Sequence, residues 1–176
     1  MATPLSTFNN VDMGGDVLCV KAIRTGFNNP GVLSGTGTSI LGNAPNQFVN
    51  SGAALTMTAD AHLGVTVFLS SATGAITLPA ATGSGNTYFI VVTLASTAAT
   101  ITAAGSDKIA GVAVMGTAAG TAPNAFSIAV GTTVSLNGTT KGGVIGTTLQ
   151  FTDVAPAVWI VEANMIGSGT PVTPFT

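Results

Sequence analysis

Apolar side chains recur at every second position over many short stretches of this chain. Val65, Val67 and Leu69 fall on one face of an extended segment, and so do Val134 and Leu136. This alternation is typical of half-buried strands, and glycine, proline or asparagine bounds most of these stretches. Short strands at this spacing predict an all-β fold, a jelly-roll or related antiparallel β-sandwich. The predicted strands are residues 17–23, 54–58, 65–69, 75–78, 88–94, 99–102, 109–115, 126–130, 133–136, 147–151 and 158–163.

Three local patterns refine this prediction. Residues 88–92 are apolar on both faces, which predicts a central strand. Asn137-Gly138 lies between two strand-like runs and predicts a tight hairpin turn. Pro79 lacks the N–H that a strand ladder needs, so the strand at 75–78 is expected to end there.

Two segments lack the alternation. Residues 25–53 are rich in Gly, Asn and Ser, and residues 167–176 form a Pro-rich tail. We expect a single domain in three regions: an N-terminal strand and extended arm at 1–53, the β-sandwich core at 54–166, and the tail. Aromatic side chains bury much area at a small entropic cost, so they are expected to anchor these segments, in this chain or in a neighbour. The candidate anchors and interface residues are Phe8, Phe27, Phe48, Pro171, Pro174 and Phe175.

The charge content is the most unusual feature of the composition. Charged residues make up 6% of the 176 residues, against roughly 25% in an average soluble protein. Surface charge keeps copies of a protein apart, so this surface favours burial in an assembly over the alternative of an uncharged monomer. The net charge is −2 without a basic patch, and nucleic acid is therefore not an expected partner. The longest apolar run, 88–95, is far shorter than the roughly 18 residues of a spanning helix, so no membrane is expected.

The candidate chemical motifs are incomplete. The Gly83-Ser-Gly85 loop lies between two strands without the third glycine and following helix of a dinucleotide fingerprint, so a turn with positive φ is expected there. His62, the single histidine, has Asp60 two residues away. A metal site needs three or four ligands, and a Ser-His-Asp triad needs a nucleophile elbow, and neither is found. We expect His62 to be a polar residue at the start of a strand.

Paired carboxylates are the remaining candidates for catalysis, because glycoside cleavage uses two of them. No spacing among the candidates favours a particular pair. The sequence therefore predicts no catalytic residue, no metal ligand and no cofactor-binding residue, and a protein that is not an enzyme. The candidate carboxylates are Asp60, Asp107, Asp153 and Glu162.

Several longer stretches of the chain carry a resemblance to a known family. They are residues 54–69 (ALTMTADAHLGVTVFL), 75–92, 107–114, 134–143 and 170–175, and LPAATGSG within the second stretch is the most distinctive. Over about two thirds of the chain they resemble a family of small structural proteins of tailed bacteriophages.

The resemblance implies a virion protein without catalytic residues, and more specifically a capsid cement or decoration protein. Such a protein binds the outer capsid surface and stabilises the shell at junctions between major capsid subunits. The implied partners are the major capsid protein and further copies of the chain in a homotrimer.

Two other function classes stay open. Similar segments also occur in tail-fibre-associated chains, so a tail-fibre or adaptor module with carbohydrate recognition is the alternative. Aromatic residues on an exposed loop would favour it, whereas Tyr88 and Trp159 lie in strands expected to be core. A glycan hydrolase is the third hypothesis, and it requires two close carboxylates in a cleft.

Overall fold

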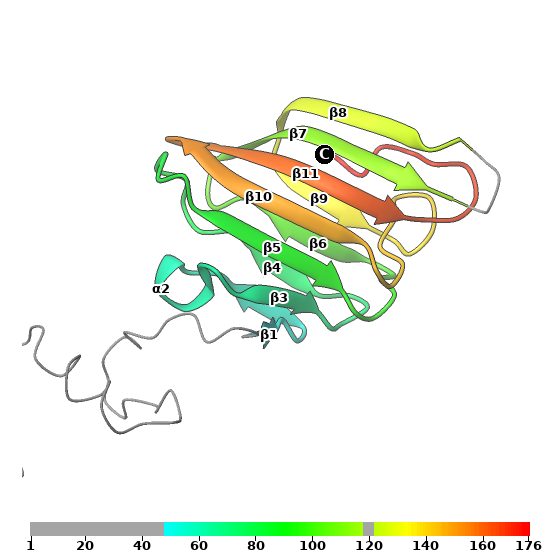
Figure 1. Cartoon of the computed structure of the whole chain (residues 1–176), viewed down its shortest axis with the longest axis horizontal. Helices are drawn as coiled ribbons and strands as arrows, with labels where there is room; N and C mark the ends of the chain where they lie inside the picture. Colours follow the sequence, from blue (N-terminus) through cyan, green and yellow to red (C-terminus); the bar gives the residue numbers. More distant parts are fainter. Residues whose placement is uncertain (1–47, 118–121) are drawn as a thin grey trace, which may run out of the picture. The chain divides into compact units, whose positions relative to one another are not determined.

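The computed structural model describes residues 48–117 and 122–176, which form two β-sheets (Figure 1). The described part of the chain is therefore all-β in class, as the sequence predicts. The seven-stranded sheet contains, in spatial order, β1 (Phe48–Asn50), β3 (Thr66–Leu69), β5 (Thr87–Val92), β10 (Thr148–Ala155), β11 (Val158–Ile166), β7 (Lys108–Gly116) and β8 (Asn124–Gly131). The four-stranded sheet contains β2 (Ala54–Thr56), β4 (Ala75–Thr77), β6 (Ala99–Thr102) and β9 (Thr133–Leu136).

From β1 to β6 the chain winds as a coil that visits the two sheets in turn. β1, β3 and β5 pair in parallel in one sheet, and β2, β4 and β6 pair in parallel in the other. Facing residues in neighbouring coils, such as Phe48 and Thr66 or Ala54 and Ala75, lie roughly 20 positions apart, a period typical of solenoids. Each parallel pair needs a long crossover, and in this molecule the crossover passes through the opposite sheet.

This winding corrects the antiparallel prediction. Five of the nine strand pairs are parallel and four are antiparallel, so the sheets are mixed. A jelly roll is built from antiparallel pairs, and that finer prediction is not confirmed. The physical reason is that a short apolar run bounded by glycine has the same pattern whichever way its neighbour runs.

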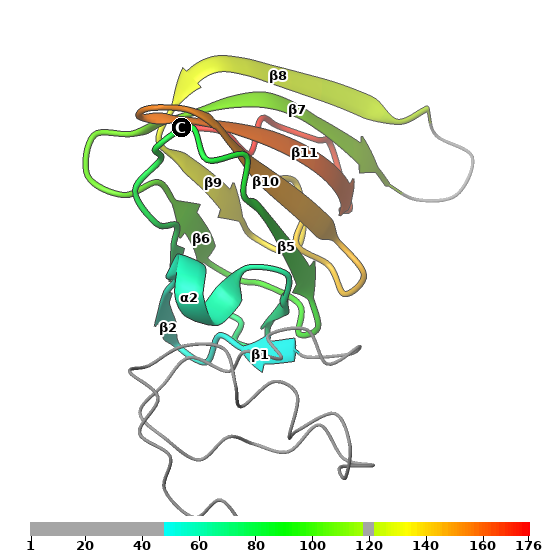
Figure 2. The same ribbon diagram turned by 60° about the vertical axis from the view of Figure 1, so that its left-hand side comes forward.

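The hairpin of β10 and β11 lies between β5 and β7 in the seven-stranded sheet. β10 is antiparallel to β5 and β11, whereas β11 is parallel to β7. Figure 2 separates the two layers, with β2, β6 and β9 in one and β5, β10, β11, β7 and β8 in the other. The hairpin thereby brings the end of β10 beside the loop that precedes β5.

The core lies between the two sheets, where alternate side chains of both point inward. Val67 and Leu69 are fully buried and Val65 nearly so, and Val134 and Leu136 are buried on the opposite sheet. The two alternation predictions are therefore confirmed.

The largest buried side chains come from the central strands of the seven-stranded sheet. Tyr88 and Trp159 meet edge to face with ring centroids 5.6 Å apart, and Phe151 is fully buried. Burial of a side chain of this size contributes about 1.5–3 kcal/mol. β5 is central in strand order, as predicted, but Phe89 on its other face is 39% exposed, so only one face of the strand is covered.

Each of the ten predicted strands that fall on described residues is present. The prediction at 17–23 lies outside the described residues. Two elements were not predicted. β1 has three residues and falls within the expected arm, and α2 (Ala59–His62) is a four-residue helix whose N-cap is Thr58.

The Asn137-Gly138 prediction of a tight hairpin is wrong. β9 and β10 belong to different sheets, and residues 137–147 connect them. The Asn137 side chain accepts a hydrogen bond from the Lys141 amide at 2.8 Å and so organises a turn within this connection. Gly138 has a φ of +71°, and a Cβ there would clash with the Ser96 carbonyl oxygen, so the glycine serves a close approach of two backbones.

Candidate functional site

The loop between β4 and β5 surrounds the carboxylate of Asp153, which lies on β10 and is 2% exposed. The Gly83 amide donates to Oδ1 at 2.7 Å and the Ser84 amide to Oδ2 at 3.1 Å. The Thr82 amide donates to both oxygens, at 3.1 and 3.0 Å. The hydroxyls of Ser84 and Thr82 donate to Oδ2 at 2.7 and 3.1 Å. Three successive amides and two hydroxyls therefore bind one buried carboxylate.

Two glycines allow the loop to take this shape. Gly83 and Gly85 have φ of +79° and +76°, which confirms the predicted turn with positive φ. A Cβ on Gly83 would lie 3.2 Å from Cα of Ala155, so the glycine also permits a close approach to the hairpin. Successive amides that point to one side form an anion-binding concavity. The anion in this concavity is the carboxylate of Asp153, which occupies the position that a phosphate would take.

A second carboxylate holds the start of the same loop. Oδ2 of Asp107 accepts a hydrogen bond from the Ala81 amide at 2.7 Å. The Ala157 amide donates to the Ala81 carbonyl at 3.0 Å, and the Asp153 amide donates to the Asn86 carbonyl at 2.9 Å. The four consecutive amides of residues 81–84 thus all donate to carboxylates. We call residues 79–86 the carboxylate loop.

The environment keeps Asp153 ionised. Burial alone would raise the pKa of Asp153, because burial disfavours the charged form. The hydrogen bonds from the Ser84 hydroxyl and from the amides of Thr82, Ser84 and Gly83 outweigh burial and hold the pKa well below its usual range. A general acid or base needs a pKa near the operating pH. Asp153 is therefore suited to holding the loop and not to transferring protons.

One feature of the sequence does indicate this site. Leu149, Phe151 and Asp153 alternate on the inner face of β10. A carboxylate at an inward position of an apolar strand requires hydrogen-bond partners, because an unpaired buried charge is strongly unfavourable. Its donors, however, lie 69 to 71 residues earlier in the chain, and no local pattern points to them.

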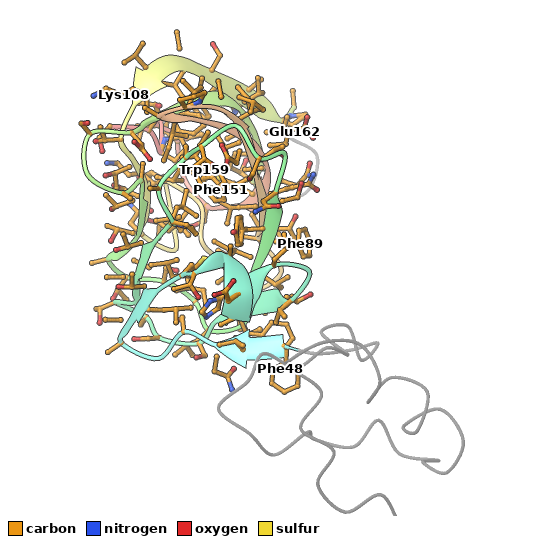
Figure 3. All side chains as sticks on the ribbon, turned by 90° about the vertical axis from the view of Figure 1, so that its left-hand side faces the viewer. Phe48, Phe89, Lys108, Phe151, Trp159 and Glu162 are labelled. Atoms are coloured by element: carbon orange, nitrogen blue, oxygen red, sulfur yellow. The ribbon has the colours of Figure 1, made fainter. Side chains whose placement is uncertain are left out.

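The other titratable candidates do not form a site. His62 ends α2 instead of starting a strand, because Thr58 begins a helical turn there. His62 is 7% exposed, and its Nδ1 lies 3.0 Å from the Thr58 amide nitrogen. Within residues 48–117 and 122–176, no three His, Cys, Asp or Glu side chains are grouped as metal ligands. Asp107 and Asp153 both hold the carboxylate loop, and Glu162 is exposed on the seven-stranded sheet, away from the buried Trp159 (Figure 3).

The seven-stranded sheet has one face that points away from the four-stranded sheet, which we call the outer face. Phe48, Phe89 and Val112 on this face are 55%, 39% and 44% exposed. Figure 3 shows Phe89 and Glu162 on the same side of the sheet, with Phe151 and Trp159 in the interior. These exposed apolar side chains are separated from one another by polar residues of the neighbouring strands. One row of cross-strand neighbours on the outer face is Phe48, Thr66, Phe89, Gln150, Glu162, Val112 and Ser127, in which Glu162 is the one charged residue.

The predicted interface residues separate into two groups. Phe48 is accessible, and its ring stacks on Phe68 with centroids 4.8 Å apart. Phe175 is 4% exposed within the core of this chain, Pro174 is buried and Pro171 is half-buried. Phe175 therefore anchors the tail on its own chain. Phe8 and Phe27 lie outside the described residues.

Comparisons with protein-family models, curated proteins and solved structures find no match for this chain. In the part of the chain that the structure describes, no helix has the length and apolar character required to cross a membrane. The functional argument therefore depends on the surfaces and contacts described above.

Proposed function

We propose that this chain is a structural protein of a bacteriophage virion, a cement protein that binds the outside of the capsid. It acts as a homotrimer and stabilises the shell where major capsid subunits meet. The resemblance of residues 55–175 to small structural proteins of tailed phages supports this role, and so does the low charge of the whole chain.

The observation that carries the proposal is the outer face. It presents apolar side chains from β1, β5 and β7 over a sheet of seven strands, and Glu162 is the one charge in its central row. The buried centres of protein interfaces are likewise depleted of charge and enriched in aromatic residues. Such a face suits a protein that is covered by neighbours for most of its lifetime.

The fold also suits binding to a shell at many points. Each contact of a cement protein is modest, but one trimer bridges several capsid subunits, so avidity replaces affinity at a single site. The carboxylate loop ties the connection before β5 to Asp153 on β10. Less conformational entropy is then lost when the outer face binds its partner.

One observation favours the tail-fibre or adaptor alternative. Phe89 lies opposite Gln150, and Gln150 lies opposite Glu162, on the outer face. An apolar ring beside an amide and a carboxylate offers the mixed apolar and polar contacts of a small-ligand site. Tyr88 and Trp159, the other aromatic candidates, are each 1% exposed and are not accessible to a sugar. A glycan array probed with the wild type and with Phe89→Ala separates this alternative from the cement role.

Shell binding by a charged variant tests the proposal. Phe89→Glu places a charge on the outer face opposite the uncharged Thr66 and Gln150, and we expect binding to undecorated capsids to weaken about tenfold or more, since an unpaired charge buried in an interface is unfavourable. Leu63→Glu is the matched control, because Leu63 is 43% exposed against 39% for Phe89 and lies between α2 and β3. Co-sedimentation with capsids measures both, and equal binding of the two variants would contradict the proposal.

A further inference from the structure

Residues 174–176 lie along the free edge of β9 as a short added strand. The Ser135 amide donates to the Pro174 carbonyl at 2.7 Å, and the amides of Thr132 and Thr133 donate to the main-chain oxygen of Thr176 at 2.8 and 3.0 Å. The Thr176 amide returns a hydrogen bond to the Thr133 carbonyl at 3.0 Å. This is strand addition, in which main-chain hydrogen bonds give affinity.

A socket in the core gives the contact its specificity. Val134 and Phe175 form an antiparallel bridge, and the Phe175 side chain joins the core cluster at 4% exposure. Gly131 borders the same place, since a Cβ there would lie 3.1 Å from the Thr176 oxygen and 2.8 Å from Cδ1 of Ile128. We call residues 131–135, with this socket, the tail groove. The tail groove accepts an extended peptide whose middle residue places an aromatic side chain in the socket. The main-chain oxygens of the two flanking residues accept the hydrogen bonds.

The connector that leads to the tail groove consists of residues 167–173. Most of residues 167–173 are exposed, and none is charged. Three of their amides, those of Gly167, Ser168 and Val172, donate to backbone carbonyls of other segments. Seven residues span up to about 24 Å when extended, a length that reaches beyond the chain's own groove.

We propose that the tail groove also binds residues 174–176 of a second copy, so that neighbouring copies are joined by exchanged strands. The contacts are the same within one chain and between two, so exchange replaces each contact with an identical one. Within one chain the tail has an effective concentration on the order of millimolar, and exchange is therefore expected where copies are crowded. The crowding of copies rests on the proposed function. The capacity of the tail groove to bind a tail does not depend on that function.

Two full-length variants test the groove without a capsid. Phe175→Ala keeps the groove but weakens the chain's own tail. Ser135→Pro removes the amide that binds Pro174 and leaves the tail intact, and proline is tolerated at an edge where its nitrogen faces away from the ladder. In a mixture, isotope-labelled Phe175→Ala is the acceptor and unlabelled Ser135→Pro is the donor. We expect saturable NMR shifts of the acceptor's Thr133 and Ser135 amides.

The controls isolate the two halves of the contact. A donor that carries both Ser135→Pro and Phe175→Ala should bind at least tenfold more weakly. Ser135→Ala keeps the amide and should not act as a donor, because its tail stays in its own groove. If Phe175→Ala does not fold, Phe175→Val takes its place as acceptor, and if Ser135→Pro does not fold, a peptide of residues 170–176 takes its place as donor. The absence of saturable shifts up to millimolar donor would overturn the inference and leave the cement proposal standing.

Discussion

Two irregular segments of this chain are similar in composition but are held in place by different interactions. The carboxylate loop, residues 79–86, and the tail, residues 167–176, are both rich in proline, glycine and hydroxyl side chains. Charge-assisted hydrogen bonds to Asp107 and Asp153 hold the loop. Main-chain hydrogen bonds and the burial of Phe175 hold the tail.

The difference determines what each segment can do. Releasing the loop would break the charge-assisted hydrogen bonds that three amides and two hydroxyls donate to Asp153, so the loop is a firmly held part of the sandwich. Releasing the tail exposes one aromatic side chain and a short strand edge, and an identical tail can replace it. The loop therefore stabilises the chain by itself, whereas the tail is suited to linking one chain to another.

The largest expected effect is the loss of the carboxylate that holds the loop. Asp153→Ala removes the charged acceptor of the amides of Thr82, Gly83 and Ser84, and a hydrogen bond to a charged group contributes about 1.5–3 kcal/mol. We expect the free energy of unfolding, measured by urea denaturation, to fall by about 3–5 kcal/mol. Glu162→Ala, at an exposed carboxylate, should change it by less than about 0.5 kcal/mol. Similar losses in both variants would refute the role assigned to the loop.

A smaller effect is expected at the anchor of the tail. Phe175→Ala removes the buried ring, which contributes about 1.5–3 kcal/mol. Hydrogen exchange should accelerate at the Ser135 amide, which binds the tail, and stay slow at the Gly83 amide, which binds Asp153. Equal acceleration at both amides would mean that the two segments unfold together and that the comparison does not hold.

Stability at acid pH should distinguish the carboxylate loop from the tail, because an ionised carboxylate holds the loop. The pKa of Asp153 is lowered in the folded chain, so the unfolded chain binds a proton first as the pH falls below the usual aspartate pKa of about 4. Its contribution to stability is complete above that pH and declines as the pH falls further. The urea midpoint, measured between pH 5 and about pH 2, should fall in Phe175→Ala as it does in the wild type. In Asp153→Asn the fall should be smaller, because the carboxyl group that binds this proton is absent. An unchanged slope in Asp153→Asn would contradict this assignment.

The smallest expected difference compares one glycine from each segment. Gly83 and Gly169 have φ of +79° and +72°, so alanine suffers similar backbone strain of about 1 kcal/mol at both positions. At position 83 the added Cβ would also lie 3.2 Å from Cα of Ala155, whereas at position 169 the nearest atom is 3.7 Å away. We expect Gly83→Ala to be the more destabilising by roughly 1 kcal/mol in thermal or urea unfolding. Equal losses would indicate that the loop has room to move away from the hairpin.

Sequence patterns were sufficient for the strands and insufficient for their arrangement. The alternation of apolar and polar residues predicted both ends of β6 and of β9 correctly, because the face on which a side chain lies depends on its own position along the strand. The coiled segment from β1 to β6 shows no sequence repeat. Its successive turns differ in length, and they need to share only a similar geometry, not a similar sequence. Asp153 and its donors, and Phe175 and its groove, are separated by tens of residues, and such pairings become visible only once the sheets are formed.

The most direct test of the cement role is the copy number of this chain in purified virions, measured by quantitative mass spectrometry against the major capsid protein. The account predicts a count equal to that of the shell subunit or a simple fraction of it, because a cement trimer occupies repeated junctions of the shell. A count that matches only the symmetry of the tail, or absence from the particle, would contradict it.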